Sequence, residues 1–261
     1  MSAGALGPPA DLTGHGEAAL ARKALLVEDD VAIARLVQAV AEDTGVELVH
    51  ATDLAQAGRA LLEDRFDVIV ADLMLPDGCG VQWLESQGAC GRLVATRVVA
   101  FSAGVSAAAR ARLGAVGVQG FLHKPVSVST LAQWLLPEQA LPTASAPERE
   151  PPCPPQGAEA AIAHLFGGDR ELYDSFRAAC LARLDAEQRQ AQLWLQQGDL
   201  AALGRLGHSL KSALRLLGEP ALAEQALALE QHCTSSESDI EGAQEAWGQM
   251  SQALSAWAAR A

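Results

Sequence analysis

The sequence predicts a doubly wound parallel α/β sheet of five strands, followed by an all-α bundle of about four main helices. Between residues 23 and 136, five short apolar runs alternate with segments whose apolar residues recur at helical spacing, the pattern of a parallel sheet with right-handed crossovers. From residue 158 onward, helical spacing continues with no strand pattern and a single proline, Pro220. Seven prolines lie between residues 137 and 155, so the two patterns belong to separate domains.

The first domain is expected to gather the carboxyl ends of its strands at one edge. Each expected strand is a short, continuous apolar run, which is typical of strands buried on both faces of a parallel sheet. Open sheets of this kind bind ligands at the edge formed by the carboxyl ends. The expected strands cover residues 25–27, 46–51, 67–71, 97–101 and 118–122, and the helices cover 31–41, 54–62, 81–86, 106–116 and 127–136.

The second domain is expected to pack long amphipathic helices as antiparallel neighbours, because the breaks between them are short. The prolines before it favour an extended linker, in which about twenty residues at ~3.1 Å each span up to ~60 Å. The expected helices cover residues 158–165, 171–197, 200–217, 221–233 and 240–260. The expected organisation is a disordered leader at 1–21, a first domain at 22–137, a proline-rich linker at 138–157 and a helical bundle at 158–261.

The acidic composition argues against several function classes. The formal net charge of -13 disfavours nucleic acid as a direct partner, because that binding depends on basic surface, and it disfavours an anionic membrane surface. The five cysteines are scattered, which indicates a reduced cytosolic protein. The sequence shows neither a signal peptide nor a run of about 18 apolar residues. We therefore expect a cytoplasmic protein without a membrane span.

Acidic side chains follow two of the expected strands. Glu28, Asp29 and Asp30 come directly after the first strand, and Asp72 ends the third. Crowded carboxylates repel one another unless a cation neutralises them, and a cluster of oxygen ligands suits Mg²⁺. Two other readings stay open for the acids alone: Asp72 could turn the chain after a strand, and the three acids could form a solvated helix N-terminus.

A hydroxyl and an ammonium group complete the same edge. Ser102 follows the fourth strand and Lys124 follows the fifth. Together with Asp72 and a metal ion, these groups would cradle a phosphoryl group carried on a carboxylate, because the cations neutralise its oxygens and the hydroxyl donates to one of them. The combination predicts phosphoryl chemistry at this edge.

Four motifs, LLVEDD, DVIVADLMLPDG, VVAFSAG and GFLHKP, occur in this order over residues 22–137. This part of the chain resembles the receiver domain of two-component response regulators, which has a flavodoxin-like fold. Asp30 falls outside the acidic pair of that family. The resemblance implies Asp72 as phosphoacceptor, Glu28, Asp29 and the Met74 backbone carbonyl as further Mg²⁺ ligands, Ser102 as switch hydroxyl, Lys124 as phosphate-binding lysine, Phe121 as switch aromatic, and a cis peptide between Lys124 and Pro125.

Two positions near the expected phosphoacceptor lack groups that could orient a hydrolytic water. Met74 lies two residues after Asp72, and Gly104 lies two residues after Ser102. Neither side chain offers an amide or a carboxylate. We therefore expect phospho-Asp72 to lose its phosphate slowly, which suits a protein that passes the group onward.

The expected helix at 200–217 carries a histidine, His208, on the side opposite its apolar leucine stripe, so the histidine is expected to point outward. Taken alone, a surface histidine is usually only solvated. The motif HSLK and the glycine at 218 make residues 158–261 resemble the histidine-containing phosphotransfer (HPt) domain. The resemblance implies His208 as phosphoryl carrier and Lys211 as its electrostatic helper. Ser212 replaces a usual glycine, and bulky Arg215 replaces a small residue, where it could crowd docking or grip phosphate.

The two resemblances together predict a phosphorelay intermediate. Asp72 would accept a phosphoryl group from a phosphohistidine, and His208 would exchange it with a receiver aspartate in this chain or another. The partners would be a sensor histidine kinase or other phosphohistidine donor and the receiver of another response regulator. No Gly-rich nucleotide box of a kinase is evident, so the chain would transfer phosphate without ATP. Two alternatives stay open: a phosphorylation-switched binding module with an inert His208, and a phosphate sink.

Overall fold

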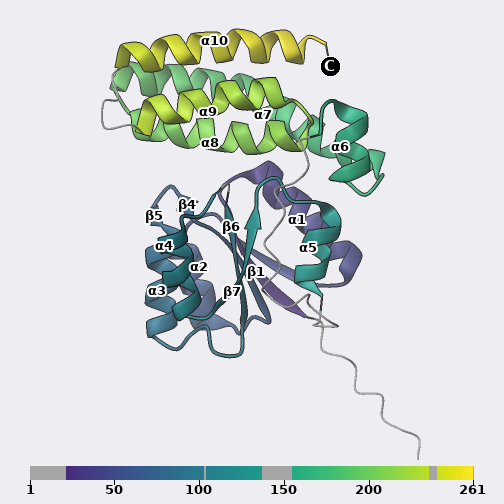
Figure 1. Ribbon diagram of the computed structural model, residues 1–261, viewed down its shortest axis with the longest axis vertical. Helices are drawn as coiled ribbons and strands as arrows, with labels where there is room; N and C mark the ends of the chain where they lie inside the picture. The colour runs from purple at the N-terminus through teal and green to yellow at the C-terminus, as the bar shows by residue number, and fades with distance from the viewer. Residues whose placement is uncertain (1–21, 103, 137–154, 235–239, 261) are drawn as a thin grey trace, which may run out of the picture.

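The computed structural model describes residues 22–102, 104–136, 155–234 and 240–260. The leader predicted at 1–21 and nearly all of the linker predicted at 138–157 lie outside these residues. An α/β domain lies on one side and a layer of long helices lies across one end of it (Figure 1). The part of the chain that the structure describes contains no helix that is long and apolar enough to cross a membrane.

The α/β domain contains a five-stranded sheet whose strands are all parallel, in the order β2-β1-β3-β6-β7. Apolar positions of the flanking helices α1 and α5 join one core, and those of α2, α3 and α4 join the other. The predicted doubly wound fold is therefore confirmed. The strands are β1 (Lys23–Val27), β2 (Glu47–Ala51), β3 (Val68–Asp72), β6 (Arg97–Ser102) and β7 (Val118–His123), and the helices are α1 (Val31–Thr44), α2 (Leu54–Glu63), α3 (Gly80–Ala89), α4 (Ala107–Ala115) and α5 (Val128–Leu135).

A short hairpin, β4 (Met74–Leu75) and β5 (Gly78–Cys79), follows the central strand β3 and was not predicted. The turn between its strands holds Asp77, whose carboxylate accepts hydrogen bonds of 3.0 Å from the backbone N–H groups of Leu54 and Ala55. These N–H groups open helix α2 and have no partner within the helix. Asp77 therefore ties the loop after β3 to the neighbouring helix.

The second domain is a helical bundle, as the sequence predicted. Asp169 and Asp199 cap α7 and α8 by accepting hydrogen bonds from backbone N–H groups. Gly198 ends α7 in the left-handed conformation (φ 72°) that glycine adopts at little cost. The helices are α6 (Ala158–His164), α7 (Arg170–Gln197), α8 (Leu200–Leu216), α9 (Pro220–Thr234) and α10 (Ile240–Ala258).

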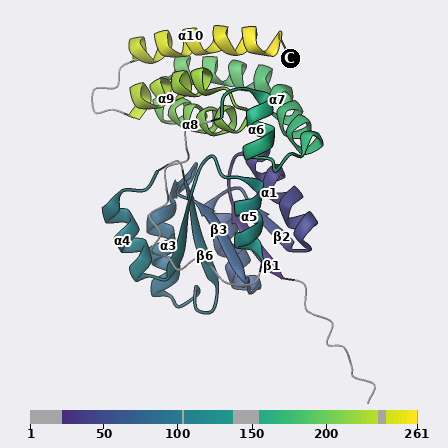
Figure 2. The same cartoon turned by 45° about the vertical axis from the view of Figure 1, so that its right-hand side comes forward.

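The bundle lies over the end of the sheet at which the parallel strands finish, in both views (Figures 1 and 2). Helix α7 packs against α1, and the backbone N–H of Val128 donates to the carbonyl of Leu165 at 2.8 Å. Buried apolar residues of α1 and α5 and of the bundle helices belong to one continuous core. The two domains are therefore docked, and the docked face includes the edge where phosphoryl chemistry is predicted.

Candidate functional site

The three acids after β1 separate into two roles. Asp30 is the N-cap of α1, and its Oδ1 accepts hydrogen bonds from the N–H groups of Ala32 (2.8 Å) and Ile33 (3.3 Å). Glu28 and Asp29, by contrast, share a cluster with Asp72 in which one oxygen of each lies within 4.8 Å of the others. Asp30 thus lies outside this cluster, in agreement with the acidic pair that the resemblance implied.

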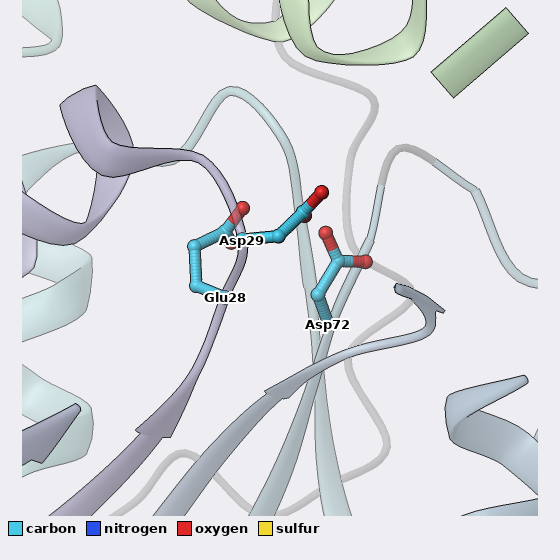
Figure 3. A group of neighbouring side chains, drawn as sticks. All are labelled: Glu28, Asp29 and Asp72. Atoms are coloured by element: carbon cyan, nitrogen blue, oxygen red, sulfur yellow. The ribbon is translucent and has the colours of Figure 1, made fainter. Parts of the chain in front are cut away.

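The carboxylate cluster concentrates negative charge in a buried place. Glu28 and Asp72 are each 1% exposed, and the carboxylates of Asp29 and Asp72 face one another from the ends of β1 and β3 (Figure 3). Burial raises the pKa of Glu28 well above its ordinary value; Lys124 opposes the rise, and the charge of Asp72 adds to it. Burial and Asp72 likewise raise the pKa of Asp29. The cluster supplies only oxygen ligands and gains from neutralisation, so it fits a hard divalent cation.

Lys124 bridges two of the three carboxylates of this cluster. Its Nζ donates to Glu28 Oε2 and to Asp72 Oδ2, both at 2.6 Å, and its side chain is 3% exposed. Burial lowers the pKa of Lys124, but the carboxylates of Asp72 and Glu28 outweigh that effect and raise it above its ordinary value. The ammonium therefore stays charged. The peptide bond between Lys124 and Pro125 is cis, as the resemblance implied.

The backbone beside Asp72 is fixed by a hydrogen bond and by close packing. The N–H of Met74 donates to Asp72 Oδ1 at 3.0 Å. A Cβ on Gly80 would lie 2.4 Å from the carbonyl oxygen of Asp72, so only glycine fits there. Ser102 is buried, and its Oγ donates to the carbonyl oxygen of Gly104 at 3.3 Å. The structure therefore brings the predicted hydroxyl to the end of β6, beside β3.

Phe121 takes no part in the carboxylate cluster. Its ring is half-buried, and the guanidinium of Arg110 lies over it, 4.4 Å from the ring centroid. This contact between a cation and an aromatic face partly covers the ring. The switch role implied for Phe121 stays a prediction.

The histidine lies in a place that sequence analysis did not predict. His208 was expected to point outward, and this is wrong: the residue lies on α8 and is only 6% exposed. Lys211 and Ser212, on the same side of the helix, are also buried. Two neighbours cover this side, namely helix α9 and the α/β domain, because residues of both line a cleft together with His208.

Glu230 of α9 is a candidate functional residue that sequence analysis missed. Its Oε1 lies 2.7 Å from His208 Nδ1, and its Oε2 accepts from Lys211 Nζ at 2.5 Å. Burial opposes ionisation of Glu230, but the hydrogen bonds from His208 and Lys211 outweigh it and lower its pKa. A charged carboxylate can only accept, so it favours a hydrogen bond donated by Nδ1–H, and in a neutral imidazole the other nitrogen, Nε2, is then unprotonated. His208 Nε2 is buried without a hydrogen-bond partner.

Gly207, next to His208 on α8, is the sequence signal that could have indicated the close approach of α9 and its Glu230. A Cβ on Gly207 would lie 3.0 Å from the backbone N of Glu230 and 3.1 Å from the carbonyl oxygen of Ala226. Glycine at 207 thus allows α8 and α9 to approach closely. That approach brings the carboxylate of Glu230 within reach of the imidazole, although 22 residues separate them in sequence.

A cleft of about 440 Å³ lies between the two domains, lined by receiver residues that adjoin Asp72 in sequence or follow β6 and by His208 and its partners. The α/β domain contributes Met74, Ser102 and Gly104 to its lining, and the bundle contributes His208, Lys211 and Glu230, among others. Arg215 does not line this cleft; its guanidinium pairs with Glu224 at 3.3 Å. The structure therefore brings the predicted histidine to the edge of the sheet where Asp72 lies.

Comparisons with known proteins agree with this two-part organisation. Residues 24–135 match the family model of the response regulator receiver domain, and residues 171–260 match that of the Hpt domain. The chain is 28% identical over 218 residues to the sensor protein GacS of Pseudomonas syringae pv. syringae, covering 77% of this chain and 23% of GacS. It is 29% identical over 201 residues to the virulence sensor protein BvgS of Bordetella pertussis, covering 70% of this chain and 16% of BvgS.

The chain thus spans less than a quarter of the length of these relatives. Among solved structures, the chemotaxis response regulator CheY4 of Vibrio cholerae is similar to part of the chain, with 27% identity and a TM-score of 0.41. That match covers 43% of this chain and 94% of CheY4.

Proposed function

The chain belongs to the two-component signalling proteins, with a response regulator receiver domain followed by an Hpt domain, and on that premise we propose that it is a phosphorelay intermediate. Asp72 accepts a phosphoryl group from a phosphohistidine, and His208 exchanges that group with a receiver aspartate. The donor is a sensor histidine kinase or another phosphohistidine protein, and the onward acceptor is a second receiver. Similarity to a protein named sensor histidine kinase supports this choice of partners.

The cleft between the domains is the observation that carries the proposal. It is lined by Ser102 and Met74 beside the proposed phosphoacceptor and by His208 and Lys211 on the bundle. A donor and an acceptor of phosphate must approach within a few ångströms with their reacting atoms aligned. A docked arrangement that puts both sides on one cleft supports exchange between Asp72 and His208.

The residues of the receiver perform the first transfer. A carboxylate oxygen of Asp72 attacks phosphorus, the new P–O bond forms, and the P–N bond of the donor histidine breaks with its electron pair returning to nitrogen. The ammonium of Lys124 is already 2.6 Å from Asp72 Oδ2. It can therefore pair with the phosphoryl oxygens on Asp72 and neutralise their negative charge. Ser102 donates its hydroxyl to one of these oxygens. Glu28, Asp29, Asp72 and the Met74 carbonyl would hold Mg²⁺, which supplies further neutralisation of phosphoryl charge.

The second transfer depends on the tautomer of His208. Its Nε2 lone pair attacks phosphorus, the P–N bond forms, and the P–O bond to Asp72 breaks with its electrons returning to the carboxylate. The ring retains its proton on Nδ1 and becomes cationic, and Glu230, 2.7 Å away, neutralises that charge. Lys211 lies beside both groups and can attract the phosphoryl oxygens.

Transfer of labelled phosphate among the wild type, Asp72→Ala and His208→Ala tests the proposal. A small phosphodonor such as acetyl phosphate loads Asp72 in the presence of Mg²⁺. We expect acid-labile, base-stable label on His208 in the wild type and none in either single variant. Mixing the two variants restores that label if exchange also occurs between molecules. Absence of histidine label under every condition would favour a binding module with an inert His208.

The proposal also covers the boundaries of the two domains and the cellular compartment. We place the receiver at residues 22–137 and the phosphotransfer bundle at 158–261, which enclose the two family matches. The cysteines that the structure describes are free thiols, which supports action in the reducing cytoplasm.

A further inference from the structure

One ion pair joins the two domains beside the proposed phosphoryl site. Arg183 of α7 places its guanidinium 3.0 Å from Asp30 Oδ1 at the start of α1. The Asp30 side chain is 2% exposed and that of Arg183 is 32% exposed. Glu187 pairs with the same guanidinium at 2.5 Å and fixes its direction. The pair therefore lies at the interface, partly shielded from water.

The docked receiver covers the side of the bundle that carries His208. Helix α8 is buried on both sides, although one side carries His208, Lys211 and Ser212. The apolar side packs within the bundle, and receiver residues such as Met74 and Ser102 line the cleft against the polar side. A second receiver would have to occupy the same place in order to reach His208 Nε2, which is buried.

From these contacts we propose that the chain's own receiver, held by the Asp30–Arg183 pair, competes with other receivers for the docking surface over His208. The inference rests on the proposed function, because only phosphate exchange gives the competition its consequence. While the pair is closed, His208 exchanges phosphate only with Asp72 of the same chain. When it opens, Arg183 is free to bind an equivalent acid on an incoming receiver, including a second copy of this chain.

Asp30 suits this role because its position is fixed and its charge is not needed in the carboxylate cluster. It caps α1 through two backbone N–H groups, so its carboxylate is held where α7 docks. Asparagine caps helices about as well as aspartate. Asp30→Asn therefore removes the charge of the pair while it keeps the cap.

The test measures transfer between two variant chains. The donor is the His208→Ala chain loaded at Asp72, and the acceptor is the Asp72→Ala chain, whose His208 receives label only from the donor. Adding Asp30→Asn to the acceptor breaks the ion pair between the acceptor's receiver and the acceptor's bundle. Arg183 of the acceptor is then free to pair with Asp30 of the donor. We expect the rate of label transfer to rise on the order of three- to tenfold, the effect of losing a partly shielded ion pair.

Two further acceptors serve as controls. Arg183→Glu in the acceptor removes docking to both receivers, so its transfer rate should not exceed that of the unmodified acceptor. Arg189→Glu changes the same charge at an exposed position of α7 and should leave the rate unchanged. A rate that does not respond to Asp30→Asn, or that responds equally to Arg189→Glu, overturns the inference.

A chemical probe separates failure of this inference from failure of the proposed function. Diethyl pyrocarbonate modifies accessible imidazoles, and mass spectrometry can follow its reaction at His208. We expect Asp30→Asn to accelerate modification of His208 severalfold without any phosphate present. If modification accelerates but no chain ever carries phosphohistidine, the competition for the surface stands and the relay function fails. If modification does not accelerate, the proposed covering of His208 by the receiver is wrong.

Discussion

In the proposed relay, Glu230 selects the imidazole nitrogen of His208 that accepts the phosphoryl group. Its contact of 2.7 Å with His208 Nδ1 favours the tautomer that leaves Nε2 as nucleophile. We predict that Glu230→Ala slows the arrival of label at His208 by roughly tenfold, the lower end of the scale seen when a metal-binding histidine loses its orienting carboxylate. Glu230→Gln should retain part of the rate, because an amide oxygen still accepts a hydrogen bond from Nδ1–H.

The control for this prediction lies on the same helix. Glu224 is an exposed acid of α9 whose contact is with Arg215, so Glu224→Gln should leave the rate within about twofold of the wild type. Initial rates from acetyl-phosphate-loaded chains measure all three variants, with thermal unfolding as a check on folding. A wild-type rate in Glu230→Ala would show that the tautomer is set by other groups.

The carboxylate cluster predicts an unusual dependence of stability on pH in the absence of Mg²⁺. The pKa values of Glu28 and Asp29 are raised by burial in the folded chain. Between the ordinary and the raised values the folded state binds more protons than the unfolded state, so these groups make stability rise as pH falls. Lys124, whose pKa is raised, stays protonated across this window and contributes no slope. Saturating Mg²⁺ should reverse the trend, because the ion requires ionised carboxylates.

Urea unfolding between neutral and mildly acidic pH measures this effect. The contribution of the cluster is the difference between the wild type and Glu28→Gln, which removes one raised group and keeps its size. We expect the Mg²⁺-free difference to change with pH in the stated direction. Equal pH slopes for the two chains would contradict the prediction.

At the scale of elements, the close approach of α8 and α9 positions Glu230. A Cβ on Gly207 would lie 3.0 Å from the backbone N of Glu230, so the helices must separate by a few tenths of an ångström. We predict that Gly207→Ala costs about 1 kcal/mol, because overpacking outweighs the higher helix propensity of alanine, and that it slows labelling of His208. Gly248→Ala on α10, where a Cβ meets nothing within 4 Å, should instead stabilise the chain by about 0.5–1 kcal/mol.

Chemical denaturation measures both glycine variants, and the label assay measures their effect on His208. Equal stability of the two variants would mean that α9 shifts to admit the new Cβ at position 207 without lowering the free energy of unfolding. A slower transfer in Gly207→Ala together with an unchanged rate in Gly248→Ala would connect helix spacing to the position of the Glu230 carboxylate.

The elements themselves were largely predictable because each one carries its own signal. The run at 68–72 is continuous and apolar up to its acid, and its five residues are all buried in β3. Helix starts were marked by capping residues such as Asp199. The hairpin β4/β5 was missed because its strands have two residues each, too few to show a period.

The contacts between distant elements were not predictable in the same way. Helical spacing showed that His208 lies opposite the apolar stripe, but it could not show that α9 and the receiver cover that side. The partner of His208 is 22 residues away, and the partner of Asp30 is 153 residues away. Such pairs depend on how whole helices pack, and a single periodic pattern contains no information about that packing.

At the scale of the whole molecule, the bundle is docked over the edge of the sheet where the parallel strands end. The proposed phosphoacceptor, Asp72, lies at this edge. The edge contributes Met74, Ser102 and Gly104 to the cleft, and the bundle contributes His208 and its partners. Asp72 itself is 1% exposed, so solvent has little access to its carboxylate in the docked chain.

We predict a long-lived phospho-Asp72 in the His208→Ala chain, where transfer to the bundle cannot occur. The side chains at 74 and 104 that line the cleft offer no amide or carboxylate to orient an attacking water, and orientation of the nucleophile is a large part of catalysis in phosphoryl hydrolysis. Decay of the label with Mg²⁺ should take minutes or longer, and loss within seconds would exclude the idea. Met74→Asn, which adds a water-orienting amide at a 38% exposed position, should shorten the lifetime severalfold. Met74→Leu, which adds no such group, should not shorten it, and this contrast separates water orientation from a simple loss of packing.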